Sequence, residues 1–117
     1  MLNALAVGAG GFIGAVLRYL IGLIPLKEST LFPYKTFGIN LVGCLLIALI
    51  VMLCARHYLI SPRWILFWKA GLCGGFTTFS TFALESVELI HTGHAGLALL
   101  YIVLSSLLGC AIILLID

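Results

Sequence analysis

Residues 71–82 read Gly71-Leu-Cys-Gly-Gly-Phe-Thr-Thr-Phe-Ser-Thr-Phe82, within an apolar segment that runs from residue 63 to residue 90. As one helix this segment would be about 42 Å long, whereas the hydrocarbon core of a bilayer is about 30 Å thick. Adjacent glycines followed by β-branched hydroxyl residues are poor helix formers. Non-helical backbone at such depth persists only where it is buried in protein or lines an aqueous cavity. The stretch therefore predicts a helix broken near residues 74–78, with an ion or substrate site at the break.

The composition of the whole chain is that of a membrane protein. Its 117 residues are 63% hydrophobic and 9% charged, and the mean hydropathy is +1.28. A soluble domain carries about 25% charged residues, so this chain has too few charges to cover a globular surface. This excludes a soluble enzyme, a nucleic-acid-binding protein and a disordered chain. We expect a multi-pass protein of the cell's inner (plasma) membrane, surrounded by lipid.

Four apolar segments divide the chain, and each is too long for a strand and lacks strand alternation. Polar residues that include Lys27, Glu28 and His57 separate them. We therefore expect an all-α protein with four transmembrane helices, which form one compact membrane domain over residues 1–117. The expected helices cover residues 2–24, about 36–55, 63–90 (with the break) and 95–116.

The distribution of basic residues gives the chain no preferred orientation in the membrane. Four helices place both termini on one side, and three basic residues belong to each side of the membrane. The positive-inside rule therefore favours neither direction of insertion. We expect dual topology, with two oppositely inserted copies forming an antiparallel homodimer. The two sets are Arg56, Arg63 and Lys69 on the side of the termini, and Arg18, Lys27 and Lys35 on the other.

Several motifs that resemble known sites have a simpler structural explanation. Gly10 and Gly14 do not complete a nucleotide-binding loop, because Ile13 occupies the position of its last glycine. Their spacing instead favours close helix packing. The pair Glu88 and His91 has the spacing of a di-metal ligand set, but it occurs only once. The four cysteines lack any ligand spacing and are expected to be small buried hydrophobes. No nucleophile–base pair supports an enzyme.

Polar side chains inside the apolar segments are the candidate pore residues, each with an alternative structural role. Arg18 and Lys69 each either reach the membrane surface or attract anions into a water-filled vestibule. Asn40 either bonds a neighbouring helix or donates to an ion. Tyr101 and Ser105 are four residues apart and share one face of the fourth helix, which Gly109 continues.

Phe79 and Phe82 project from one helix face beside the expected break. They are either ordinary packing residues or contacts for a small anion, because an aromatic ring has a positive edge. Ring edges accept an anion without placing a cation in the membrane. Glu85, which lies one turn after Phe82, is expected to extend a polar track or to be hydrogen-bonded inside the protein.

Taken together, three motifs resemble those of the Fluc (CrcB) family of fluoride channels. The third-helix motif, residues 71–82, is the most specific of the three. Residues 10–19, Gly-Gly-Phe-Ile-Gly-Ala-x-x-Arg-Tyr, resemble the first-helix motif, and residues 38–43, Gly-Ile-Asn-Leu-Val-Gly, resemble the second. The resemblance covers essentially the whole chain in order, length and helix count.

The resemblance implies a channel that exports fluoride passively from the cytoplasm and so lowers its toxicity. It implies an antiparallel dual-topology homodimer with two fluoride pores, each lined by both chains. The broken helices would cross at the dimer centre, where backbone carbonyls of Gly74 and Thr77 from each chain would hold a structural sodium ion.

The resemblance also assigns roles to individual side chains. Phe79 and Phe82 would contact fluoride with their ring edges, and Asn40 would donate its amide N–H. Tyr101 and Ser105 would line the polar track. Gly109 departs from the pattern, because some members carry a second hydroxyl there. The resemblance further implies a polar track or vestibule that draws on Arg18, Thr78, Ser80, Thr81 and Glu85.

The alternative function is a small multidrug resistance-type transporter, a dual-topology exporter of cationic compounds with a similar size. That mechanism needs a carboxylate within the first membrane helix. Residues 1–24 contain no Asp or Glu, which counts against this function. A non-transporting assembly subunit would explain the glycine-rich helix faces but not the broken helix.

Overall fold

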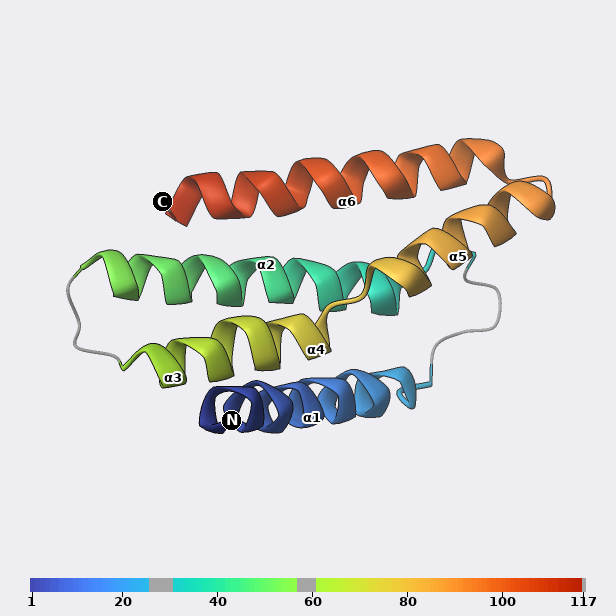
Figure 1. Ribbon diagram of the computed structural model, residues 1–117. Helices are drawn as coiled ribbons and strands as arrows, with labels where there is room; N and C mark the ends of the chain where they lie inside the picture. Colours follow the sequence, from blue (N-terminus) through green and yellow to red (C-terminus); the bar gives the residue numbers. More distant parts are fainter. Residues whose placement is uncertain (26–30, 57–60, 117) are drawn as a thin grey trace.

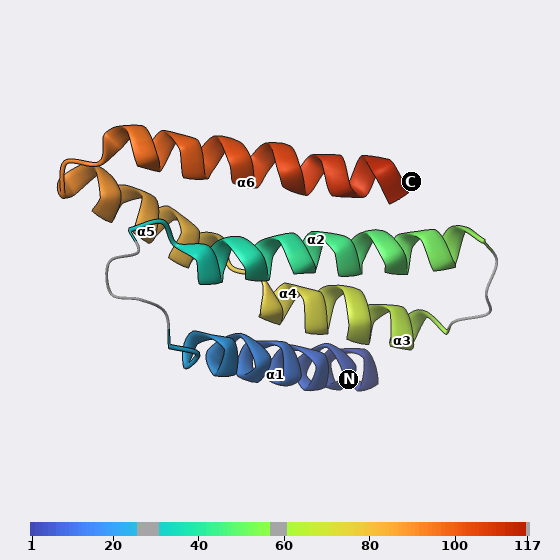
Figure 2. The ribbon, with the colours of Figure 1, turned by 180° about the vertical axis from the view of Figure 1, so that it is seen from behind.

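The computed structural model describes residues 1–25, 31–56 and 61–116, and these residues form helices joined by short connections. The helices lie side by side and alternate in direction, so that both termini lie at the same end (Figures 1 and 2). Three helices are long and continuous: α1 (Leu2–Gly22), α2 (Tyr34–Ala55) and α6 (Ala95–Ile116). The third segment comprises α3 (Pro62–Ile65), the π-helix η1 (Leu66–Cys73), α4 (Gly74–Phe76) and α5 (Phe79–His91).

The four helical segments predicted from the sequence are confirmed within the described residues. Helices α1, α2 and α6 are each long and apolar enough to cross a membrane. The third segment is divided at its middle and contains no single helix of that length. The predicted polar connections at residues 27–30 and at His57 lie outside the described residues.

The break lies at Thr77 and Thr78, inside the predicted range of 74–78. Thr77 has φ −82° and ψ 159°, and Thr78 has φ −148° and ψ 122°, so both are extended. Within that range the adjacent glycines stay helical, since Gly74 and Gly75 belong to α4. The hydroxyl residues leave the helix, and the Thr78 side chain begins the next one by accepting a hydrogen bond from the Thr81 amide at 3.2 Å.

The glycines instead allow α1 to pack closely against η1 and α4. A Cβ atom on Gly75 would lie 2.5 Å from the Gly11 carbonyl oxygen, and one on Gly71 would lie 2.7 Å from the Val7 carbonyl oxygen. A Cβ on Gly14 would lie 2.7 Å from the Phe76 nitrogen. Backbones this close leave no space for side chains, which confirms the packing interpretation of the α1 glycines.

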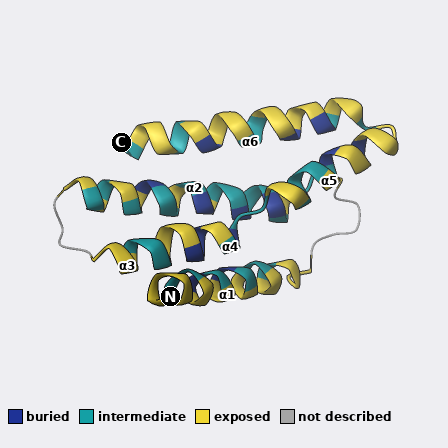
Figure 3. Cartoon of the chain, viewed as in Figure 1, coloured by how far each residue is buried: buried dark blue, intermediate teal, exposed yellow. Residues whose placement is uncertain are grey.

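Helices α2 and α5 pack mainly against α6. Leu89, Ala98 and Tyr101 form a small buried cluster there, with Phe82 packed against it. Most outward-facing side chains are apolar and exposed (Figure 3). Such a surface is suited to lipid or to a second membrane-embedded chain rather than to water. At the end that carries the termini, Arg63 Nε donates to Asn3 Oδ1 at 3.3 Å.

Candidate functional site

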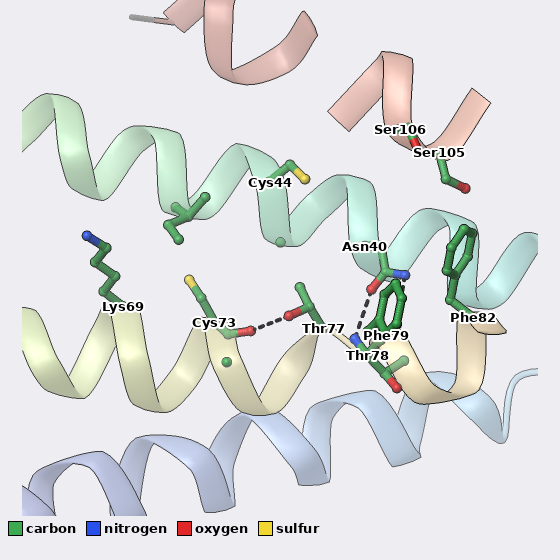
Figure 4. A pocket seen from close by; sticks show the side chains of 13 residues that line it. Asn40, Cys44, Lys69, Cys73, Thr77, Thr78, Phe79, Phe82, Ser105 and Ser106 are labelled. Carbon is green, nitrogen blue, oxygen red and sulfur yellow. Dashed lines mark hydrogen bonds between the residues drawn. The ribbon is translucent and has the colours of Figure 1, made fainter. Parts of the chain in front are cut away.

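A cavity of about 430 Å³, here called the central cavity, lies beside the break in the third segment (Figure 4). Its wall comes from α2, η1, α4, the first turn of α5 and the middle of α6. Most of the wall is apolar, and the polar side chains come from several different elements. The lining residues are Asn40, Gly43, Cys44, Ile47, Lys69, Cys73, Gly74, Thr77, Thr78, Phe79, Phe82, Ser105 and Ser106.

Asn40 holds the break in place by bonding both polar groups of the Thr78 backbone. The Thr78 N–H donates to Asn40 Oδ1 at 3.0 Å, and Asn40 Nδ2 donates to the Thr78 carbonyl at 3.2 Å. The expectation that Asn40 bonds a neighbouring helix segment is therefore confirmed. A side-chain amide nitrogen carries two hydrogens. One N–H of Asn40 bonds the Thr78 carbonyl, and the other is left over.

The break deprives several backbone carbonyls of their usual helical donors, among them those of Gly74 and Thr77. In a continuous helix, the Thr78 amide would bond the Gly74 carbonyl and the Thr81 amide would bond the Thr77 carbonyl. Here the Thr78 amide donates to Asn40, and the Thr81 amide donates to the Thr78 hydroxyl. A Cβ built on Gly74 meets nothing within 4 Å, so this position faces open space. These carbonyls are hard oxygen ligands, which suit a small alkali cation.

The two phenylalanine rings lie at the edge of the central cavity. The Phe79 ring is 80% exposed, and its centroid lies 6.0 Å from that of Phe82. Phe82 also contacts Tyr101 edge-on, with centroids 4.9 Å apart and an interplanar angle of 60°. Phe82 is thus anchored by packing, whereas Phe79 projects from the surface of a single chain.

The fourth helix contributes Ser105 to the central cavity but not Tyr101. Tyr101 is fully buried and its hydroxyl donates to Glu85 Oε1 at 3.2 Å. The Ser105 Oγ atom is buried and has no hydrogen-bond partner among the described residues. Gly109 is buried against Cys44, whose Sγ would lie 3.1 Å from an added Cβ. An unsatisfied hydroxyl in a cavity wall is a donor available to a ligand.

A second cavity of about 340 Å³, here called the vestibule cavity, lies on the other side of the break. Thr78 lines both cavities. Arg18 Nε donates to the Gly75 carbonyl at 3.4 Å, and Lys35 Nζ donates to the Gly22 carbonyl at 2.7 Å. The lining residues are Arg18, Tyr19, Gly22, Leu23, Lys35, Thr36, Ile39, Thr78, Thr81 and Glu85.

The hydroxyl residues Thr78, Ser80 and Thr81 differ in the cavities that they line. Thr78 and Thr81 line the vestibule cavity together with Arg18 and Glu85. Ser80 lines neither of the two cavities described here, and its Oγ lies 3.5 Å from the Thr78 hydroxyl.

The sequence analysis missed Cys73 and Ser106 as lining residues of the central cavity, whereas Lys69 and Thr77 were already candidates, as a vestibule charge and a sodium ligand. Lys69, Cys73 and Thr77 recur every four residues, and this spacing places them along one side of the third segment. That pattern was available from the sequence. Ser106 also lines the cavity, but its hydroxyl donates to the Ile102 carbonyl at 2.9 Å. No sequence pattern distinguishes Ser106 from Ser105.

The sequence of the chain is similar to those of known proteins. A family model described as CrcB-like protein, Camphor Resistance (CrcB), matches residues 5–116. A relative from Chlorobaculum tepidum is 47% identical over 102 residues, covering 87% of this chain and 81% of the relative. One from Agrobacterium fabrum is 42% identical over 112 residues, covering 95% and 90%. One from Azobacteroides pseudotrichonymphae is 39% identical over 110 residues, covering 93% and 88%. Each relative is named "Fluoride-specific ion channel FluC".

Proposed function

The chain belongs to the CrcB family, and on this premise we propose that it is a fluoride-selective channel that lets fluoride leave the cytoplasm passively. The shared name of the relatives supports the choice of ion. The observation that carries the proposal is the central cavity, in which ring edges, an amide and an unsatisfied hydroxyl meet beside a broken helix. The channel forms one transmembrane domain over residues 1–117 in the plasma membrane.

Neutral groups conduct the anion in this proposal. Fluoride is small and strongly hydrated, so a narrow passage must replace part of its water shell. The ring edges of Phe79 and Phe82, the free Asn40 N–H and the Ser105 hydroxyl each replace part of it. Because no single contact is a strong charged site, the ion binds weakly enough to leave. Tyr101 does not line the central cavity. Its ring packs against Phe82, and its hydroxyl donates a hydrogen bond to the Glu85 carboxylate.

The vestibule cavity supplies the approach from one side of the membrane. Arg18 provides positive charge there, while Thr78, Thr81 and Glu85 provide polar groups along the wall. Ser80 acts through the Thr78 hydroxyl. Since Thr78 lines both cavities, it marks the passage from the vestibule cavity to the central cavity.

The pore is completed by a second, oppositely inserted copy of the chain. Polar side chains line the central cavity, and lipid would leave them unsatisfied, while the exposed Phe79 ring at its edge is accessible to a partner chain. Equal numbers of basic residues on the two sides support insertion in both directions. The antiparallel dimer therefore has two pores, each lined by both chains. The substitution His91→Cys on a cysteine-free background tests this topology. Comparable fractions of the protein should be labelled at this cysteine from each side of the membrane.

A sodium ion at the dimer centre is the proposed structural cofactor. The Gly74 and Thr77 carbonyls fit this ion, because they have lost their helical donors and are hard oxygen ligands. The open space beside Gly74 allows the partner chain to approach. When bound, sodium would neutralise these carbonyl dipoles and hold the two broken segments together.

Reconstitution into liposomes tests the function directly. Vesicles loaded with fluoride should release it rapidly, as read by a fluoride electrode, and vesicles loaded with chloride should release little. Protein-free vesicles provide the background. Equal release of both anions, or no release above background, would contradict the proposal.

A further inference from the structure

Lys69 is the one charged residue among the described residues that line the central cavity. It lies on η1, toward the opposite end of the cavity from Asn40 and the phenylalanine rings (Figure 4). Its side chain extends into the space between η1 and α2 (Figure 4). The central cavity therefore has a cationic end and a neutral end.

The cationic end lies near the membrane surface. The third segment begins at Pro62, and its first turns carry the exposed side chains of Trp64 and Trp68. Tryptophan is enriched at the interface between membrane and water. Lys69 follows Trp68 directly, whereas Phe79 lies beyond the break in the middle of the segment. Lys69 therefore lies at the mouth of the central cavity.

The charge of Lys69 is not offset by a bond within the described part of the chain. Three other basic residues each donate to an oxygen, namely Arg18, Lys35 and Arg63. For Lys69, the described residues contain no hydrogen-bond or ion-pair partner, and no carboxylate lines the same cavity. The vestibule cavity differs, because Glu85 lies there with its two cations.

We propose that Lys69 is an electrostatic entry residue that concentrates small monovalent anions at the outer end of the central cavity. This inference rests on the proposed channel function and adds a rate-setting residue to it. A single positive charge at a mouth raises the local anion concentration and the entry rate. Selectivity stays with the neutral groups near Phe79. In an antiparallel dimer, a mouth carrying Lys69 faces each side of the membrane.

The test measures fluoride efflux from liposomes at two ionic strengths, set with impermeant gluconate. At about 10 mM salt the Debye length is about 30 Å, and at about 1 M it is about 3 Å. We expect Lys69→Gln to reduce efflux about two- to tenfold at low salt and to match the wild type at high salt. Lys69→Arg should retain wild-type efflux, and the fluoride-to-chloride ratio should not change.

Arg63→Gln is the matched control, because it removes a basic residue at the same end but outside the central cavity. It should leave efflux unchanged at both salt concentrations. A Lys69→Gln deficit that persists at high salt would indicate a packing role and overturn the inference. Unchanged efflux at low salt, or an equal deficit in Arg63→Gln, would do the same. A wild-type protein without fluoride efflux would overturn the proposed function as well.

Discussion

The third membrane segment has two halves, which meet at Thr77 and Thr78. The two halves have different roles, although their residues are neighbours in the chain. Before the break, η1 and α4 lie against α1 with backbones almost in contact, and glycines make this possible. After the break, α5 presents Phe79, Phe82 and Glu85 to cavities or to buried polar partners. The first half, here called the rigid half, packs glycines against α1 and also brings Lys69 to the central cavity, whereas the second half contributes the aromatic rings and Glu85. A short extended linker allows one segment to do both.

The largest expected effect comes from removing a glycine in the rigid half's contact with α1. In Gly14→Ala the new Cβ would lie 2.7 Å from the Phe76 nitrogen and would also meet the Leu72 carbonyl oxygen. Since these neighbours are backbone atoms, the helices must separate, at a cost of about 1–3 kcal/mol or more. We expect loss of a monodisperse dimer by size-exclusion chromatography.

Gly8→Ala is the control on the same helix, because its Cβ would meet nothing within 4 Å. Alanine propagates helices better than glycine, so this variant should be at least as stable as the wild type. If Gly14→Ala gave the same elution profile as Gly8→Ala, close packing would not be what the rigid half requires.

The next effect is expected at Asn40, which links the break to α2. Asn40→Asp keeps an acceptor for the Thr78 amide but loses the donor to the Thr78 carbonyl. It also places a carboxylate in a poorly solvated cavity, where it repels an anion. We expect fluoride efflux to be abolished while the protein still elutes as a dimer. Efflux at the wild-type rate would limit Asn40 to helix packing.

The aromatic pair tests whether the second half provides chemistry or only volume. Phe79→Ile and Phe82→Ile keep much of the apolar volume, so each should cost less than about 1.5 kcal/mol of stability. Each removes a positive ring edge, and efflux should fall more than tenfold, which corresponds to about 1.4 kcal/mol of barrier.

The exposed Phe12 on α1 lies outside both cavities and provides the control for the aromatic pair. Phe12→Ile should leave efflux within twofold of the wild type. Near-normal efflux from both Phe79→Ile and Phe82→Ile would make the rings ordinary packing residues.

The smallest difference is expected between two adjacent serines on α6. The Ser105 hydroxyl lacks a partner among the described residues, whereas the Ser106 hydroxyl bonds Ile102. We expect Ser105→Ala to lower efflux severalfold and Ser106→Ala to change it less than twofold, both measured in liposomes. A reversed order would show that Ser106 is the hydroxyl that faces the ion.

The sequence was sufficient to predict the helical segments and the position of the break. Hydropathy and length determine the segments, and the residues at 74–78 indicated where the third one is interrupted. The sequence did not reveal which contact holds the break, because Asn40 and Thr78, which bond each other there, lie far apart in the chain. Gly71 and Gly75 serve packing against α1, a role that depends on the neighbouring helix and not on the local sequence.

The candidate site was predictable only where one helix determines it. Phe79 and Phe82 were found from their spacing, and both line the central cavity. The shared face of Tyr101 and Ser105 was also visible, but only Ser105 reaches that cavity. The sequence offered Lys69 as a vestibule charge, but it did not reveal that Lys69 lines the same cavity as Asn40 and Phe79. Contacts between helices determine which residues line a cavity, and the periodicity of one helix does not reveal those contacts.

The glycine contacts also have a consequence for biogenesis. The partners of the α1 glycines lie in η1 and α4, which are synthesised only after α2. At about 5–20 residues per second, roughly 3–12 seconds pass between the synthesis of Gly10 and that of Gly71. During this interval α1 sits in lipid with its small-residue face uncovered. The close packing of α1 therefore forms only after the third segment has been synthesised. Until then α1 lacks its partner helices and is accessible to the proteases that degrade unassembled membrane helices.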